Sequence, residues 1–170
     1  MLEIISKIRS VISLIVVIAV VLLAVLLAGV RLIGYTPYAV LSGSMMPVYE
    51  VGDLVYVKEL PPVQICKGDV ISFVAGENLT VVTHRVYDVD RKLRCFTTKG
   101  DANNAPDSGT VAYENVLGVV RFAIPKLGYL SMYMSTERGK YITYCVVGVL
   151  LLISLIPTPK KTSQKSNITD

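Results

Sequence analysis

Three polar segments of this sequence carry the side chains that nucleophilic catalysis by a serine requires. Ser44 lies in the run Ser42-Gly43-Ser44-Met45-Met46-Pro47, whose small residues would let a substrate backbone approach closely. A serine hydroxyl is a weak nucleophile at neutral pH and needs a neighbouring base to take its proton. On its own such a run is more often an ordinary loop, so the prediction depends on finding that base.

The candidate base is His84, the one histidine of the chain, in the segment Thr83-His84-Arg85. A lone histidine is more often structural or exposed than catalytic. If an imidazole activates Ser44, however, His84 is the only one available. An imidazole must be neutral to accept the serine proton, so we expect activity to fall in acid.

The candidate third group is a carboxylate in the polar loop from Lys99 to Asp107, which contains Asp101 and Asp107. Gly, Asp, Asn and Pro are also the residues expected of a solvated turn. The catalytic interpretation is that one carboxylate orients the imidazole and stabilises its cation. One histidine and scattered carboxylates do not make a metal-ligand cluster. We therefore expect no metal and no other cofactor.

Short alternating or β-branched runs, separated by turns, predict that the middle of the chain is mostly β. The predicted strands are Leu54–Lys58, Val70–Val74, Val81–Val89, Leu93–Thr98 and Val116–Ile124. No helical periodicity of useful length occurs between them. We therefore expect a small antiparallel sheet, barrel-like in form, with His84 on its third predicted strand.

Two apolar runs flank this β region. From Val11 to Val30 no residue is charged, which matches the roughly 20 residues that a helix needs to cross the hydrocarbon layer. This run is longer than that of a cleaved signal peptide, so residues 11–31 are expected to be an uncleaved transmembrane anchor. The second run, Tyr141 to Ile156, is shorter and ends at Pro157. It is either a second transmembrane helix over residues 141–157 or a buried helix, and we favour the span.

Basic residues predict the orientation of these segments. Lys7 and Arg9 lie in the short head, residues 1–10, and three lysines lie in the polar tail, residues 158–170. The positive-inside rule then places both termini in the cytoplasm and residues 32–140 on the outer or lumenal side. The expected location is the cell membrane, or the endoplasmic-reticulum membrane in a eukaryote. The net charge of +4 comes largely from the two ends, so it gives no reason to expect a nucleic-acid partner.

Two further features leave alternatives open. The segment from Gly34 to Val51 is apolar, and it either packs against the sheet or dips into the membrane interface. Three cysteines are too few for a disulfide scaffold. Cys66 and Cys95 could pair in the outer domain, although two separate buried thiols are the better expectation, and Cys145 lies in the second apolar run.

Five motifs follow one another along the chain from the anchor to about Ile124. They are Ser42-Gly43-Ser44-Met45-Met46-Pro47, Gly52-Asp53-Leu54-Val55, Gly68-Asp69-Val70-Ile71, Val82-Thr83-His84-Arg85-Val86, and Lys99-Gly100-Asp101-Ala102-Asn103-Asn104 followed by Asp107. In this order they resemble the motifs of the type I signal peptidases, in the branch of archaea and the endoplasmic reticulum. The bacterial branch has a catalytic lysine where this branch has the histidine of the fourth motif. Five matches in the order and spacing of the family are far more specific than any one alone.

The resemblance implies a role for each candidate residue. Ser44 would be the nucleophile and His84 the general base and then acid, with Asp107 as the carboxylate that orients the imidazole. Asp101 is similar to a second acidic residue that the family uses near the site in a supporting role. Ser42 matches the position whose hydroxyl helps to bind the oxyanion, alongside the Ser44 backbone N–H. The last motif departs from the usual pattern by one extra residue, Ala102, which bears on which aspartate pairs with His84. We rank Asp107 first and Asp101 second.

The resemblance therefore implies a membrane-bound serine endopeptidase that cleaves N-terminal signal peptides from preproteins through an acyl-enzyme. The expected partners are those preproteins, the lipid bilayer and the protein-export channel. The substrate would add an extended segment to a strand edge, with shallow pockets that accept small side chains near the cut. The alternative is a non-catalytic membrane-anchored β-domain that acts as a binding or assembly subunit, whose function would survive Ser44→Ala. A cysteine transpeptidase would need Cys95 as nucleophile, and nothing around that residue supports the role.

Overall fold

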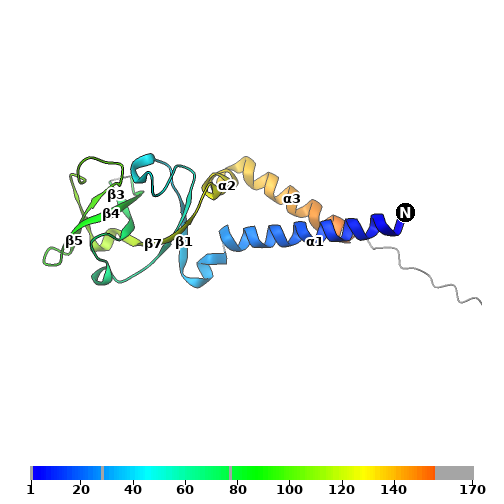
Figure 1. The fold of residues 1–170 in the computed structure, drawn as a ribbon, viewed down its shortest axis with the longest axis horizontal. Helices are drawn as coiled ribbons and strands as arrows, with labels where there is room; N and C mark the ends of the chain where they lie inside the picture. Colours follow the sequence, from blue (N-terminus) through cyan, green and yellow to red (C-terminus); the bar gives the residue numbers. More distant parts are fainter. Residues whose placement is uncertain (1, 28, 77, 156–170) are drawn as a thin grey trace, which may run out of the picture.

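A computed structural model describes residues 2–27, 29–76 and 78–155 of the 170-residue chain. Figure 1 shows a sheet domain at one end of the molecule, with two long helices extending from it in the same direction. Helix α1 (Leu2–Leu27) leads into the domain, and α2 (Leu127–Ser135) and α3 (Glu137–Leu155) lead out of it. The described residues also form short 3-10 helices at Gly29–Ile33, Gly43–Met45, Pro62–Gln64 and Tyr113–Asn115.

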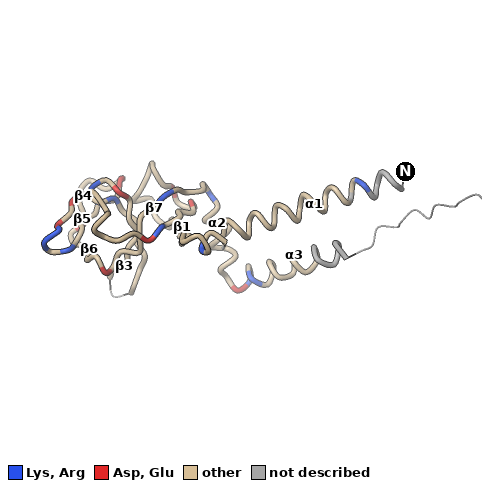
Figure 2. The backbone as a smooth tube through the Cα atoms, turned by 90° about the horizontal axis from the view of Figure 1, so that it is seen from below, with Lys and Arg blue, Asp and Glu red and all other residues tan. Residues whose placement is uncertain are grey.

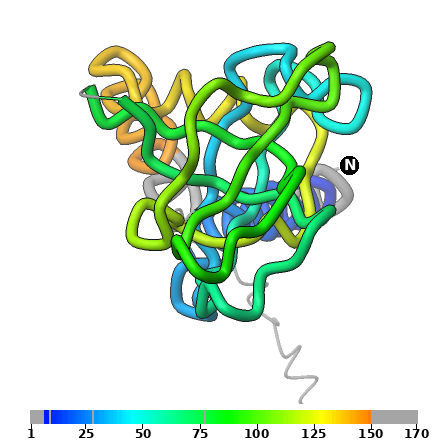
Figure 3. Tube along the Cα trace, turned by 90° about the vertical axis from the view of Figure 1, so that its left-hand side faces the viewer, coloured from blue at the N-terminus to red at the C-terminus, as the bar shows by residue number. Residues whose placement is uncertain are grey.

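Seven strands form one antiparallel sheet. They are β1 (Tyr35–Ala39), β2 (Leu54–Lys58), β3 (Val70–Ala75), β4 (Thr80–Asp90), β5 (Cys95–Lys99), β6 (Thr110–Ala112) and β7 (Val116–Ile124). Their order in the sheet is β1-β2-β7-β3-β4-β5-β6. Figure 3 looks along the molecule from the sheet end, so that the strands lie in front of the helices. Strands β1 and β6 are the two edges, and the sheet is therefore open.

The sequence located five of these strands. The predicted bounds of β2 and β7 match the structure, and those of β3, β4 and β5 differ by one or two residues at an end. The barrel-like form was wrong, because the short edge strands β1 and β6 do not pair with each other among the described residues. Strands β1 and β6 and helix α2 were not predicted. Pro37 weakens the strand signal of β1, although an edge strand tolerates proline.

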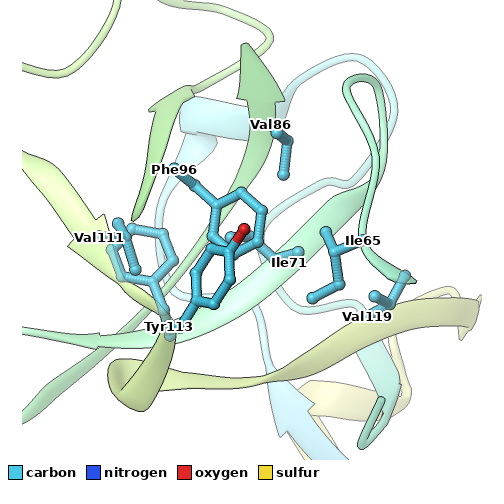
Figure 4. Close-up of a cluster of buried hydrophobic side chains, with 8 residues drawn as sticks. Ile65, Ile71, Val86, Phe96, Val111, Tyr113 and Val119 are labelled. Atoms are coloured by element: carbon cyan, nitrogen blue, oxygen red, sulfur yellow. The ribbon is translucent and has the colours of Figure 1, made fainter. Parts of the chain in front are cut away.

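The main core holds together the strands that carry the candidate site. Figure 4 shows this cluster of buried side chains, whose members are Ile65, Ile71, Phe73, Val86, Phe96, Val111, Tyr113 and Val119. The rings of Phe96 and Tyr113 stack with their centroids 4.8 Å apart. Each fully buried side chain of this size stabilises the fold by roughly 1.5–3 kcal/mol relative to its exposure to water. The cluster therefore fixes β3, β4, β5 and β7 relative to one another.

Helix α1 is the one helix among the described residues that is long and apolar enough to cross a bilayer. Its segment Ser10–Leu27 has a mean hydropathy of 3.3 and no buried residue. Figure 2 shows no charged residue along this stretch, whereas Lys, Arg, Asp and Glu gather on the loops of the sheet domain and at the start of α3. The helix ends at Leu27, before the predicted end of the anchor at residue 31. Of the predicted second span, residues 156 and 157 lie outside the described residues, as does the predicted tail, 158–170.

A hydrogen bond and a small core cluster join the sheet domain to the end of α1. The hydroxyl of Tyr56 on β2 donates to the carbonyl of Leu26 at 2.7 Å. Val30, Leu54 and Tyr56 are buried together, and Leu27 packs against them. The ring of Tyr56 therefore lies where α1 meets the sheet, which fixes the sheet domain at the end of this helix.

The segment from Gly34 to Val51 is partly core and partly surface, so packing against the sheet describes only some of its residues. Met45 is 2% exposed and packs against Val55 and Val57 of β2. Met46 and Val48, by contrast, are 45% and 51% exposed.

The cysteines form no disulfide among the described residues. Cys95 is buried on β5, as expected, whereas Cys66 and Cys145 are exposed. The expectation of a buried thiol was therefore wrong for Cys66.

Candidate active site

Ser44 lies in the loop after β1, within the one-turn helix Gly43–Met45. The buried side chain of Met45 packs in the core next to it and holds the turn on the sheet. The carbonyl of Ser44 accepts a hydrogen bond from the N–H of Ala102 at 2.8 Å. The turn is thus held from two sides, and the Ser44 side chain is half-buried.

His84 lies on β4, opposite Ile71 of β3, and is only 9% exposed. Its Nε2 atom is 3.1 Å from Oγ of Ser44. The ring also meets the ring of Phe73 edge to face, with the centroids 6.4 Å apart. The strand pairing and the aromatic contact therefore hold the imidazole within hydrogen-bond distance of a serine hydroxyl, which is the arrangement that activates a nucleophile.

Asp107 contacts the other nitrogen of the imidazole. Its Oδ2 atom is 2.6 Å from Nδ1 of His84 and accepts a second hydrogen bond from Oγ1 of Thr98 at 2.7 Å. The N–H of Asp107 also donates to the carbonyl of Thr98 at 2.9 Å. An ionised carboxylate only accepts hydrogen bonds, so the proton of the neutral ring lies on Nδ1 and Nε2 faces Ser44 as an acceptor. The three side chains form the hydrogen-bonded sequence of a serine-histidine-aspartate triad.

Asp101, the second candidate, pairs with Arg85. The guanidinium Nε and Nη2 atoms donate to its two carboxylate oxygens at 2.8 and 2.6 Å, and Nη1 donates to the carbonyl of Gly68 at 2.8 Å. Such two-pronged pairs are geometrically specific. The hydrogen bond to Asp101 is the main cause that raises the pKa of Arg85 above its ordinary value. Because Arg85 follows His84 on β4, this ion pair ties the strand of the base to the loop that holds Ser44.

Gly100 allows that loop to approach the nucleophile. A Cβ atom at this position would lie 2.6 Å from the carbonyl oxygen of Ser44 and 2.8 Å from the side-chain nitrogen of Asn103. The contact with the backbone carbonyl of Ser44 leaves no space for a side chain. The N–H of Asn103 closes the turn by donating to the carbonyl of Gly100 at 3.0 Å. Close packing against the Ser44 turn therefore explains the glycine.

Ser42 places a second hydroxyl beside the nucleophile. It is exposed, and its Oγ atom is 3.3 Å from Oγ of Ser44. A donor for an oxyanion would have to lie about 2.7–3.1 Å from the position that the oxyanion takes. The predicted oxyanion roles of the Ser42 hydroxyl and the Ser44 N–H remain predictions.

Ser44 and His84 line a groove of about 860 Å³. One side of the groove is formed by residues 37–42, from β1 and the loop after it, and another by residues 80–84, the first half of β4. Strand β1 is an edge of the sheet, and β4 pairs with β5 only from Arg85 onward. Both strand segments therefore have an edge without a strand partner among the described residues.

Tyr49 also lines this groove. Burial raises the pKa of its phenol above the ordinary value of 10.0, while Arg85 and Asp101 act on it in opposite directions and more weakly. The N–H of Tyr49 donates to the carbonyl of Met45 at 3.0 Å, which continues the turn that begins at the nucleophile. The phenol of Tyr49 is therefore neutral through the neutral pH range.

Comparisons with known proteins identify the family. The family model described as "Signal peptidase, peptidase S26" matches residues 11–92. The catalytic subunit SEC11 of the signal peptidase complex of Komagataella phaffii is 32% identical over 132 residues, which cover 69% of this chain and 75% of that protein. The chain belongs to the signal peptidase family, peptidase S26.

Two other relatives show how much of such proteins the signal peptidase region covers. Signal peptidase I W of Bacillus subtilis is 49% identical over 86 residues, which are 49% of this chain and 45% of that protein. Human SEC11C is 32% identical over 126 residues, which are 67% of this chain and 65% of the relative. The match thus spans less than half of the Bacillus protein and about two thirds of the human one.

The range matched by the signal peptidase model contains Ser44 and His84, whereas Asp101 and Asp107 lie beyond it. The two aspartates are therefore distinguished here by their contacts alone. One acidic side chain touches the imidazole and the other touches a guanidinium.

Two parts of this signal peptidase site were missed from the sequence. Thr98 falls inside a predicted strand, and nothing in its neighbours marks its hydroxyl as a partner of Asp107. Helix α2 contributes Ser131, Met132 and Ser135 to the groove. Its nine residues are too few to give a clear helical period, so the sequence carried no signal for this wall.

Proposed function

We propose that this chain is a membrane-anchored serine endopeptidase that cleaves N-terminal signal peptides from preproteins. The observation that carries the proposal is the hydrogen-bonded sequence Ser44–His84–Asp107 at the wall of a groove. Membership of the signal peptidase family supports the substrate class. The long apolar helix α1 supports attachment to a membrane.

The reaction begins when Nε2 of His84 takes the proton of Ser44 as Oγ attacks the scissile carbonyl carbon. Asp107 keeps the proton of the neutral ring on Nδ1 and stabilises the imidazolium that forms. The imidazolium then gives its proton to the leaving amine of the mature protein, and the C–N bond breaks. The signal peptide remains as an ester on Ser44. The same imidazole deprotonates a water molecule, which hydrolyses the ester and restores the serine.

The tetrahedral intermediates carry a negative oxygen that needs hydrogen-bond donors. The hydroxyl of Ser42 and the N–H of Ser44 are the donors that we assign to it, since they flank the attacking Oγ atom. Losing one such donor typically costs about 2.7–4 kcal/mol of transition-state stabilisation. Ser42 is exposed and its hydroxyl rotates, so we expect its contribution to lie at or below the lower end of this range.

The groove suits an extended peptide. Strand β1 and the first half of β4 both have an edge without a strand partner, and they line the groove on the way to Ser44. A substrate segment placed between them would form backbone hydrogen bonds as an added strand, independent of its side chains. Alternate side chains of the segment would then point to opposite sides of the groove.

The membrane arrangement that we propose follows the basic residues and the apolar helices. Helix α1 is the anchor, residues 32–140 lie outside the cytoplasm, and α3 continues into a second span over residues 141–157. The head, residues 1–10, and the tail, residues 158–170, lie in the cytoplasm. Anchoring raises the effective concentration of the active site for preproteins that are themselves held in the bilayer at the export channel.

Preprotein cleavage by the purified full chain in detergent tests the proposal. We expect the wild type to release a mature protein with a single new N-terminus, read by N-terminal sequencing. Ser44→Ala should abolish this product, and the neighbouring Ser42→Ala, as a matched serine control, should retain a measurable rate. Equal melting temperatures of the variants would show that the fold is intact.

Two outcomes would contradict the proposal. Full processing by Ser44→Ala would exclude Ser44 as the nucleophile and favour the non-catalytic binding module. A folded wild type that cleaves no preprotein, while Ser44→Ala still binds one, would also favour that alternative.

A further inference from the structure

Helix α2 lines the groove that contains Ser44 and His84, through Ser131, Met132 and Ser135. We propose that α2 is the wall that limits which substrate side chains enter the groove, with Met132 as the residue that determines specificity. This inference rests on the proposed peptidase function and adds the element that selects the substrate. Two observations support it: α2 is fixed to the loop that follows Ser44, and Met132 is accessible to a substrate in the groove.

A buried carboxylate fixes the start of α2 to the loop that follows the nucleophile. Asp53 is 6% exposed, and its Oδ2 atom accepts a hydrogen bond from the N–H of Glu50 at 2.9 Å. Its Oδ1 atom accepts a second from the N–H of Lys126 at 3.2 Å. Lys126 is the residue before the first turn of α2 and has a left-handed backbone, with φ of 61°. The Asp53 side chain therefore connects the start of α2 to the loop that follows Ser44.

Close packing of two glycines then sets the distance between α2 and this loop. A Cβ atom at Gly128 would lie 2.5 Å from the carbonyl oxygen of Asp53 and 2.6 Å from that of Gly52. A Cβ atom at Gly52 would overlap the ring of Tyr129. Neither position has space for a side chain, so the helix lies against the backbone of the loop itself. A wall held in this way cannot retreat freely when a larger substrate enters.

Among the α2 residues in the groove, Met132 has the one large apolar side chain. The hydroxyl of Ser135 donates to the carbonyl of Ser131 at 2.8 Å, so its hydrogen is used within the helix. Met132 is 40% exposed, so its side chain is accessible and occupies space that a substrate side chain would otherwise take. Leu130, which is similarly exposed at 37%, lies on the same helix but does not line the groove.

An extended substrate between β1 and β4 would point every second side chain toward one side of the groove. The size of Met132 would then limit the side chain at the position, or the alternate positions, that faces α2. A single methylene group in such a pocket changes discrimination by roughly 10- to 200-fold. Truncating Met132 should therefore widen the accepted size at those positions and leave the others unchanged.

The test is a set of preproteins with Ala, Leu or Phe at each position of the segment before the cut. For each we would measure kcat/KM with the full-length wild type, Met132→Ala, Met132→Phe and the control Leu130→Ala. Met132→Ala should raise the rate for Leu and Phe relative to Ala roughly tenfold at one position or at alternate positions. Met132→Phe should shift the preference the other way, and Leu130→Ala should leave the order of preference unchanged.

Preference profiles of both Met132 variants that match the wild type at every position would overturn the inference. That result is separate from failure of the proposed function, in which Ser44→Ala would process preproteins as well as the wild type does. If Met132→Ala lowers the melting temperature, Met132→Leu provides a second test, because it changes the shape of the side chain at nearly constant volume. A changed substrate preference in Met132→Leu supports the inference. An unchanged preference in both Met132→Leu and Met132→Phe contradicts it.

Discussion

Asp101 and Asp107 belong to one loop, between β5 and β6, yet they serve two different faces of strand β4. Asp107 contacts the imidazole of His84 and the hydroxyl of Thr98. Asp101 grips the guanidinium of Arg85, the next residue along the strand. Successive side chains of a strand point to opposite faces, so neighbouring residues recruit different carboxylates.

The difference shows how one loop combines chemistry with support. Asp107 contacts His84, which lines the groove, and completes the triad that we propose. Asp101 holds β4 against the loop through its pair with Arg85. The next residue, Ala102, donates a hydrogen bond to the carbonyl of Ser44. An acidic residue near an active site can thus act by holding the backbone of the nucleophile in place, without touching the base.

The largest effect should follow from removing the base. We expect His84→Gln to lower kcat/KM for preprotein cleavage by about 10⁴-fold, because no other imidazole can take the proton of Ser44. The melting temperature should change little, since glutamine can still donate toward Asp107. Cleavage within tenfold of the wild-type rate would contradict the assignment of His84.

On the other face of β4, the main effect should be on stability. Arg85→Gln removes the two-pronged pair with Asp101, and we expect a loss of about 1–2 kcal/mol after allowing for the partial exposure of Arg85. Chemical denaturation in detergent would measure it. The matched control is Lys126→Gln, whose pair with Glu50 is exposed on both sides and should contribute less to stability than the Arg85 pair. Equal losses of unfolding free energy in the two variants would show that the Arg85–Asp101 pair has no special supporting role.

The smallest effect should be an alkaline dependence of stability that arises at Tyr49. Burial raises the pKa of Tyr49 in the folded state, so the neutral phenol favours folding. This stabilisation is complete below the ordinary pKa of 10.0 and is lost as the pH rises through the folded value. Thermal melts at about pH 9 and about pH 11 should show a drop that is smaller by ~1–2 °C in Tyr49→Phe. An identical drop in both proteins would mean that Tyr49 does not contribute.

The sequence predicted the regular parts of this fold well because their signals are local. Runs such as Leu54–Lys58 and Val116–Ile124 are rich in β-branched and aromatic residues, and both are strands with the predicted bounds. The edge strand β1 contains a proline, and β6 has only three residues, so neither gave such a pattern. Whether the two edge strands pair with each other decides whether the sheet is open or closed. That pairing depends on contacts between segments far apart in the sequence.

The candidate site was predictable as a set of residues and not as a set of contacts. The motifs contained Ser44, His84 and both aspartates, but spacing along a loop does not say which carboxylate reaches which side of β4. The hydroxyl of Thr98 and the wall formed by α2 become visible only once the chain is folded. The catalytic roles of Ser44, His84 and Asp107, like that of Ser42, remain predictions.

A direct comparison of Asp107→Asn with Asp101→Asn tests whether the two carboxylates have these separate roles. For each purified full-length variant we would measure kcat/KM for one preprotein and the melting temperature. We expect Asp107→Asn to lower kcat/KM by about 10³- to 10⁴-fold at a nearly unchanged melting temperature. Asp101→Asn should retain kcat/KM within about tenfold and melt at a lower temperature, by about 4–8 °C per kcal/mol lost. The opposite pattern, with Asp107→Asn active and Asp101→Asn folded but inactive, would contradict the proposed triad.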